Sequence, residues 1–238
     1  MIRIVAAGLM VGSFALVGCD DARPSASPSA SVVATGSFDS IQAADGFRVT
    51  VSPGTSSTVQ VRSSGIPANQ VQVTIADGVL TLRTASGPVP AGASLSADVT
   101  AESLVSVTGT SGALIRLSRG VALSGKAVRL KLSAGAEFSG AVQTKDFTAD
   151  LKAGSSATLS GAATRAKVSV TEASAFRAGD LELAEASVDM SAGATALMNV
   201  KRAMAVSLST GASLSYLGEP KITKQRVKTG ATLRRVEP

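Results

Sequence analysis

A short motif recurs through the second half of the chain: a small or polar residue, any residue, glycine, then a small residue. Its third position falls at Gly112, Gly135, Gly154, Ala173, Gly193, Gly211 and Gly230, so one copy carries alanine in place of glycine. The intervals between these positions are 23, 19, 19, 20, 18 and 19. A nearly constant period of this length is typical of a solenoid, in which each repeat forms one coil stacked on the next.

Aligning the repeats on this position separates an apolar column from a polar one. The residues three before the glycine are all apolar: Leu132, Leu151, Val170, Met190, Leu208 and Val227. The residues four before it are all polar: Lys131, Asp150, Ser169, Asp189, Ser207 and Arg226. Because neighbouring side chains of a strand point to opposite faces, we expect the apolar column to line a core and the polar column to face solvent.

A second apolar column follows each corner at slightly uneven spacing: Phe138, Leu159, Phe176, Leu197, Leu214 and Leu233. Glycine at the corner permits backbone angles that a β-carbon disfavours, so Ala173 predicts a coil that turns differently. A coil of about 19 residues holds three short strands and three turns, and we therefore predict a parallel β-helix. A β-sandwich is the alternative, but it has no reason to repeat one corner at this interval.

Before the repeats, apolar and polar residues alternate in short runs at 47–51, 58–62, 71–75 and 79–82. The last two runs flank Ala76-Asp77-Gly78, a turn sequence typical of a β-hairpin. No convincing helical run appears after Gly18. We therefore predict an all-β chain with an N-terminal antiparallel hairpin portion ahead of the parallel coils.

The composition limits the kinds of partner. Hydrophobic residues make up 45% of the chain but aromatic residues only 3%, and Tyr216 is the only tyrosine. Single-stranded nucleic acid stacks on aromatic rings, so we expect no nucleic-acid partner. The net charge of +6 favours anionic surfaces such as lipid headgroups or acidic glycans, although simple solubility explains it equally well.

The segment 1–18 is typical of a secretory signal, because Arg3 precedes an apolar run too short to span a bilayer. The run ends at Leu16-Val17-Gly18-Cys19, which resembles the lipobox of bacterial lipoproteins. The resemblance implies a lipid on Cys19 and a membrane anchor in the cell envelope, with the inner or outer membrane left open. An ordinary signal peptide followed by an incidental cysteine is the alternative. The Pro/Ser/Ala-rich residues 19–35 predict a tether, and 36–238 one domain.

Few residues can carry chemistry, because the chain has no histidine and one cysteine. Histidine-dependent triads are excluded, and we expect no metal or cofactor site. Asp150 and Asp189 share the polar column two coils apart, roughly 9–10 Å, near the upper limit for an inverting glycosidase pair. The simpler interpretation is surface charge, with Asp150 beside Lys131. Lys131 or Lys152 as the base of a lyase on acidic sugars is the other possibility, and we expect no catalytic residue.

Two segments resemble one known family. They are Phe38-Asp39-Ser40-Ile41 with Gly46-Phe47-Arg48-Val49-Thr50-Val51, and Leu214-Ser215-Tyr216-Leu217-Gly218-Glu219-Pro220 followed by Lys228-Thr229-Gly230-Ala231. They look like the autotransporter-adhesin "head GIN" domain, a domain of unknown function in bacterial envelope proteins. The resemblance covers residues 36–236 and implies a right-handed parallel β-helix with an antiparallel N-terminal portion and no established catalytic residues.

These observations together predict a lipid-anchored binding or scaffold module of the cell envelope. Adhesin-like and glycan-binding roles are both open, with envelope glycans or proteins as partners and the membrane contacted through Cys19. A polysaccharide-active β-helix enzyme, a lyase or a hydrolase, is the alternative function.

Overall fold

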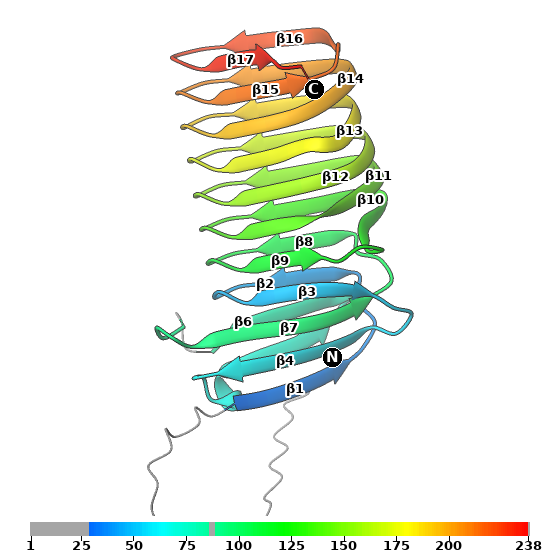
Figure 1. The fold of residues 1–238 in the computed structure, drawn as a ribbon, viewed down its shortest axis with the longest axis vertical. Helices are drawn as coiled ribbons and strands as arrows, with labels where there is room; N and C mark the ends of the chain where they lie inside the picture. Colours follow the sequence, from blue (N-terminus) through cyan, green and yellow to red (C-terminus); the bar gives the residue numbers. More distant parts are fainter. Residues whose placement is uncertain (1–28, 86–88, 238) are drawn as a thin grey trace, which may run out of the picture.

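The computed structural model describes residues 29–85 and 89–237, which form one 17-stranded sheet wound into a solenoid (Figure 1). The strands of the N-terminal portion are β1 Ser29–Thr35, β2 Ser40–Ala43, β3 Arg48–Pro53, β4 Thr58–Ser64, β5 Val71–Ala76, β6 Val79–Thr84, β7 Ser94–Ala101, β8 Ser106–Gly109 and β9 Leu114–Leu117. Those of the regular coils are β10 Ala122–Leu132, β11 Glu137–Leu151, β12 Ser156–Val170, β13 Ala175–Met190, β14 Thr195–Leu208, β15 Ser213–Leu217, β16 Lys221–Val227 and β17 Thr232–Arg235. The described residues hold one helical segment, the 3₁₀ turn η1 at Ala68–Gln70.

Each regular coil is one turn of a parallel β-helix, which confirms the predicted fold class and rejects the sandwich. In β12, residues 156–159 form a first face after the corner, 160–163 a second face, and 165–170 a third face that leads to the next corner. The strands of successive coils pair in parallel on all three faces. Two of the three irregular intervals of the repeat, those on either side of Gly193, coincide with register shifts between β12 and β13 and between β13 and β14, where β-bulges absorb the difference in length.

The first apolar column forms the core of the third face, as predicted. Leu132, Leu151, Val170, Met190 and Leu208 lie in register and are all buried. Val227 is the exception at 38% exposure, because β16 is the last strand of the third face and no strand covers it. The polar column is in register one residue earlier on the outward side, so its predicted orientation is also confirmed.

The prediction of the second apolar column is partly wrong. In register, its members on the first face are Ile115, Phe138, Ala157, Phe176, Ala196, Leu214 and Leu233. Ala157 and Ala196 therefore replace Leu159 and Leu197, since a phenylalanine ring fills more than one coil spacing and packs against a small neighbour. Leu159 is buried two positions further on, opposite Gly140, whereas Leu197 is half-buried on the outward side opposite Arg177.

A ladder of backbone hydrogen bonds runs through the corners. At each corner two consecutive residues take positive φ, for example Ala134 at +51° and Gly135 at +73°. The N–H of the second residue donates to the carbonyl of the first residue in the next coil, as Gly135 does to Ala153 at 2.9 Å. Seven such bonds, at 2.9–3.1 Å, connect eight corners from Gly46 to Thr229.

The corner at Ala173 is built like the others, so the expectation that it turns differently is wrong. Glu172 and Ala173 have φ of +54° and +57°, and the Ala173 N–H donates to Ala192 O at 2.9 Å. At Gly154, in the preceding coil, an added β-carbon would meet no atom within 4 Å. The corner therefore has room for alanine, and the cost of alanine is the left-handed backbone alone.

The N-terminal portion is not stacked in chain order (Figure 1). β2 pairs in parallel with both β6 and β8, and β3 with both β7 and β9, so an early coil lies between two later ones. The predicted hairpin is present as antiparallel β5 and β6 around Asp77 and Gly78, and β4 is antiparallel to β1 and β7. The extra residues between Gly112 and Gly135 form a turn at 118–121, where Val121 N donates to Ser118 O at 3.2 Å.

The segments expected before the domain lie mostly outside the described residues, including the signal at 1–18 and Cys19. The last part of the segment assigned to the tether, Ser29–Thr35, forms β1 and pairs with β4 along its whole length. The sheet therefore begins at Ser29 rather than at residue 36, because β4 offers an edge that satisfies the backbone of a segment with little core-forming side-chain volume.

Replacing Ala173 with glycine should stabilise the fold, because it removes the left-handed strain at the one corner that lacks glycine. We expect the free energy of unfolding to increase by about 0.5–1 kcal/mol, once the greater flexibility of glycine in the unfolded chain is included. Equilibrium urea unfolding measures it. The matched variant Gly154→Ala should lose a similar amount, and a lower urea midpoint for Ala173→Gly would contradict the corner geometry.

Candidate functional site

One shallow, open depression of about 350 Å³ lies on the described surface where the second face bends into the third, across β11 to β14. Small side chains at the bend, Ala162, Ala163 and Ala184, leave the hollow, and charged side chains of later coils form part of its rim. Its lining residues are Gln143, Thr144, Ala162, Ala163, Thr164, Glu182, Leu183, Ala184, Lys201 and Arg202.

Ion pairs connect neighbouring coils along this bend. Lys201 Nζ lies 3.7 Å from Glu182 Oε1, and Arg202 Nη2 lies 3.0 Å from Glu185 Oε1. All four side chains are between 46% and 65% exposed, so solvent screens each pair and its contribution to stability is small. The pairs orient the side chains at the rim of the depression and contribute little to the stability of the fold.

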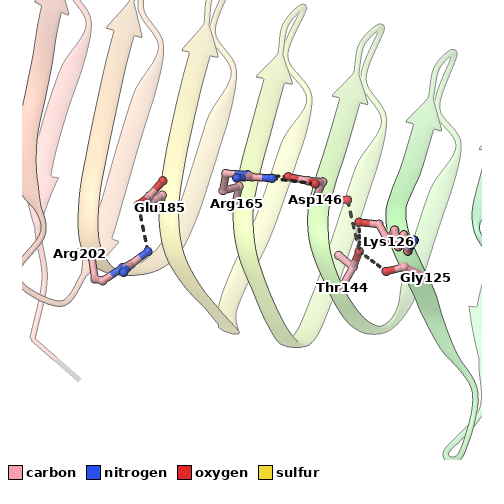
Figure 2. A network of polar contacts seen from close by, with 7 residues as sticks. All are labelled: Gly125, Lys126, Thr144, Asp146, Arg165, Glu185 and Arg202. Atoms are coloured by element: carbon pink, nitrogen blue, oxygen red, sulfur yellow. Dashed lines mark hydrogen bonds and ion pairs between the residues drawn. The ribbon is translucent and has the colours of Figure 1, made fainter.

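The best-defined polar contact joins Asp146 on β11 to Arg165 on β12 (Figure 2). Arg165 Nε donates to Asp146 Oδ1 at 2.7 Å and Nη2 donates to Oδ2 at 2.9 Å, a bidentate arrangement. These hydrogen bonds lower the pKa of Asp146 and raise that of Arg165. The Asp146 carboxylate is therefore ionised at neutral pH and cannot serve as a general acid there.

Thr144 ties the bend of β11 to the coil before it. Its Oγ1 donates to the carbonyl of Gly125 at 2.8 Å, beside the Asp146–Arg165 pair in Figure 2. Gly125 has φ of +146°, and an added β-carbon there would lie 3.3 Å from Val105. The hydroxyl therefore satisfies a carbonyl at a point where the strand leaves regular geometry.

The residues singled out from the sequence lie elsewhere. Asp150 sits opposite Lys131 and Ser169, and Asp189 sits one coil beyond Ser169, as the repeat alignment predicted. All are on the outward side of the third face, and neither they nor Lys152 lines the depression. The structure therefore does not bring the candidate carboxylates and lysines to a common concave site.

Within residues 29–85 and 89–237, no three Asp, Glu, His or Cys side chains are grouped as metal ligands. No helix of that part is long and apolar enough to cross a membrane. The predicted lipidation residue, Cys19, lies outside the described chain.

Sequence reasoning missed the ion pairs, although the repeat period contains the signal for them. Asp146 and Arg165 are 19 residues apart, as are Glu182 and Lys201, and Glu185 and Arg202 are 17 apart. Asp146 and Arg165 lie directly opposite each other on adjacent strands, whereas Glu182 and Glu185 lie opposite Asn199 and Ala203. Lys201 and Arg202 therefore reach their glutamates from neighbouring positions of the next coil. Opposite charges one period apart are therefore a readable sign of pairing between coils.

Removing the Arg165 guanidinium should raise the pKa of Asp146 toward the ordinary aspartate value of about 3.9. NMR titration of the carboxyl carbon in Arg165→Met measures the shift, and Arg177→Met is the control that should leave it unchanged. Because the folded-state pKa is depressed, the pair stabilises the fold above the ordinary pKa, and this is lost as pH falls through the folded value. An Asp146 pKa that is the same with and without Arg165 would refute the pairing.

The fold is shared with several solved bacterial proteins. A putative adhesin from Bacteroides fragilis superposes with a TM-score of 0.74 at 14% identity, over 88% of this chain and 97% of that one. A putative adhesin from Parabacteroides distasonis gives 0.65 at 15% identity, over 88% and 98%. A protein of that species described as a putative lipid binding protein gives 0.59 at 14% identity, over 90% and 98%. At such identities the likeness establishes the fold alone.

No curated protein sequence matches the chain. A family model does match, over residues 37–220, and its description is "Putative auto-transporter adhesin, head GIN domain". The matched segment includes the early coil of β2 and β3, the hairpin and the stacked corners as far as the strand before Gly218. The chain therefore belongs to the family of the auto-transporter adhesin head GIN domain.

Proposed function

We propose that this protein is a non-catalytic, lipid-anchored binding module of the bacterial envelope with an adhesin-like role. The observation that supports this most is the polar column of the third face, in register over six consecutive coils. Repeating hydroxyl and charged groups at the strand spacing of about 4.8 Å form an extended, flat surface. Such a surface suits a glycan chain or a protein better than a small substrate, which needs a concave site.

A lipid on Cys19 would determine which end of the solenoid lies near the membrane. Cys19 ends the lipobox-like segment, and β1 begins ten residues later at Ser29. Ten residues reach at most about 35 Å, so the β1 end of the solenoid stays near the membrane. Eleven strands stack along the first face from β1 to β17, which places β17 roughly 48 Å from β1.

The charge chemistry of the described surface favours binding over catalysis. A glycoside hydrolase needs a carboxylic acid whose pKa is raised, and burial beside another carboxylate is the usual cause. Asp150 and Asp189 instead lie on an open sheet face, and the pKa of Asp146, beside the depression, is lowered by its hydrogen bonds with Arg165. The enzyme alternative therefore has less support than the binding module.

Changing Cys19 should abolish lipid attachment. The full chain, expressed in a bacterial host, should partition with membranes and give an N-terminal peptide whose mass includes the lipid. Cys19→Ser should remain unlipidated and be either released from the membrane fraction or left with an uncleaved signal segment, whereas Ser25→Ala in the same tether should behave like the unaltered chain. An intact-mass measurement that finds Cys19 as a free thiol in the mature protein rejects the anchor.

The full chain, purified in a nonionic detergent, should not degrade acidic polysaccharides. Incubation with polygalacturonate or alginate should give neither ultraviolet absorbance from unsaturated products nor new reducing ends. Product that disappears in Lys131→Ala or Lys152→Ala would establish a lyase instead. Product that disappears in Asp150→Asn or Asp189→Asn would establish a hydrolase, and either result would overturn the non-catalytic proposal.

A further inference from the structure

The net positive charge of the chain is concentrated at one end of the solenoid. Residues 29–200 carry 13 basic and 13 acidic side chains, whereas 201–237 carry 8 basic and 2 acidic ones. The whole net charge of +6 therefore arises in the last coils. In Figure 1 these coils, β14 to β17, lie at the opposite end from β1.

Five of these cations are exposed and form no ion pair among the described residues. Lys201, Arg202 and Arg235 are engaged by Glu182, Glu185 and Glu219. We define the basic cap as the other five residues, which lie on β16, on β17 and in the turn between them: Lys221, Lys224, Arg226, Lys228 and Arg234.

The register sets how the basic cap is displayed. Lys224 and Arg226 lie opposite Ala205 and Ser207, on the outward side of the third face. Alternate residues of a strand are about 6.6–6.8 Å apart, so the two cations form a short row along β16. Lys228 sits at the corner, and Arg234 lies opposite Ser215 on the outward side of the first face. The positive charge therefore continues from the third face around the corner to the first.

Protection of an open edge explains part of this arrangement. Within the described chain β16 pairs only with β14 and β17 only with β15, so both present unpaired backbone groups. Lysine on such an edge discourages pairing with other chains. However, edge protection needs charge of either sign, and it does not require five cations that form no ion pair among the described residues. A surface with an excess of positive charge instead attracts a ligand of opposite charge.

We propose that the basic cap is a binding site for an acidic polysaccharide, which it recognises through carboxylate or sulfate groups spaced along the chain. This deepens the proposed function, on which it rests, by naming the ligand class. Exposed polar side chains between the cations, Gln225 and Thr232, supply hydrogen bonds of the kind that sugar hydroxyls need. A lipid surface is less favoured, because the basic cap lies at the far end of the solenoid from β1 and the proposed anchor.

Binding to polygalacturonate tests the proposal with the full chain purified in detergent. Retention on the immobilised polymer at about 150 mM salt is expected, and neutral dextran should retain nothing. The triple variant Lys221→Glu, Lys224→Glu, Lys228→Glu keeps the edge charged but repels the polymer. We expect it to weaken the affinity about tenfold or more.

A triple reversal in the central coils is the matched control: Lys126→Glu, Lys145→Glu and Lys152→Glu. It changes the net charge equally, but these exposed lysines lie at least four strand spacings from β16, roughly 19 Å, beyond the screening length of about 8 Å. It should weaken binding by only about twofold. Equal losses in the two variants would show that net charge alone binds, and no retention of the unaltered chain would show that the cap only protects the edge; both overturn the proposal.

Co-sedimentation with vesicles containing phosphatidylglycerol separates a lipid ligand from a polysaccharide. If reversal of the cap reduces vesicle binding and leaves polygalacturonate binding intact, the polysaccharide site is rejected. Failure of the proposed function is seen separately, as a free Cys19 thiol or as turnover of polyuronates. Circular dichroism and the urea midpoint of each variant establish that the solenoid is intact.

Discussion

Backbone hydrogen bonding between successive coils is the interaction on which the rest of this structure depends. Strand pairing on three faces and the ladder through the corners hold each residue beside the residue one period away. Once this register is set, the position of every side chain along the solenoid axis is determined. The buried rows from Leu132 to Leu208, the polar column and the ion pairs between coils are consequences of it. The corner tolerates Ala173 because the ladder uses the backbone and leaves space for a β-carbon.

A solenoid has two ends, and the two ends of this one differ in how they meet solvent. At the β1 end, antiparallel strands β1, β4 and β7 close the stack without any charged residue in β1. At the β17 end, Val227 is exposed where its counterparts are buried, and cations surround it. A stacked fold always leaves its last coil half-covered, so the end coils are where its sequence departs from the repeat. The proposed division of roles, with the anchor at the β1 end and the basic cap at the β17 end, follows from this difference between the two end coils.

The central coils show how a repeat carries information about side-chain contacts. Asp146 and Arg165 meet because the register places them directly opposite each other, whereas Lys201 reaches Glu182 from two positions beyond its register partner Asn199. The depression arises where small residues coincide on neighbouring coils, at Ala162, Ala163 and Ala184. The ion pairs there are exposed, and in each of them the two opposite charges cancel. The central faces therefore carry little net charge, and the last coils are the main source of the positive electrostatic potential.

The period and polarity of the repeat determined the coil length, the buried column and the outward column, because each depends only on residues within one turn and on strict alternation along a strand. Local turn chemistry likewise determined the hairpin around Asp77 and Gly78. Only the tertiary structure decided that β2 and β3 lie between β6–β7 and β8–β9, since that order depends on pairing between distant segments. It also placed Ala157 and Ala196 rather than Leu159 and Leu197 beside Phe176, because packing volume across coils is a property of three neighbouring strands together. The pairing of β1 with β4 has the same origin: a strand with few core side chains forms only where another strand offers its edge.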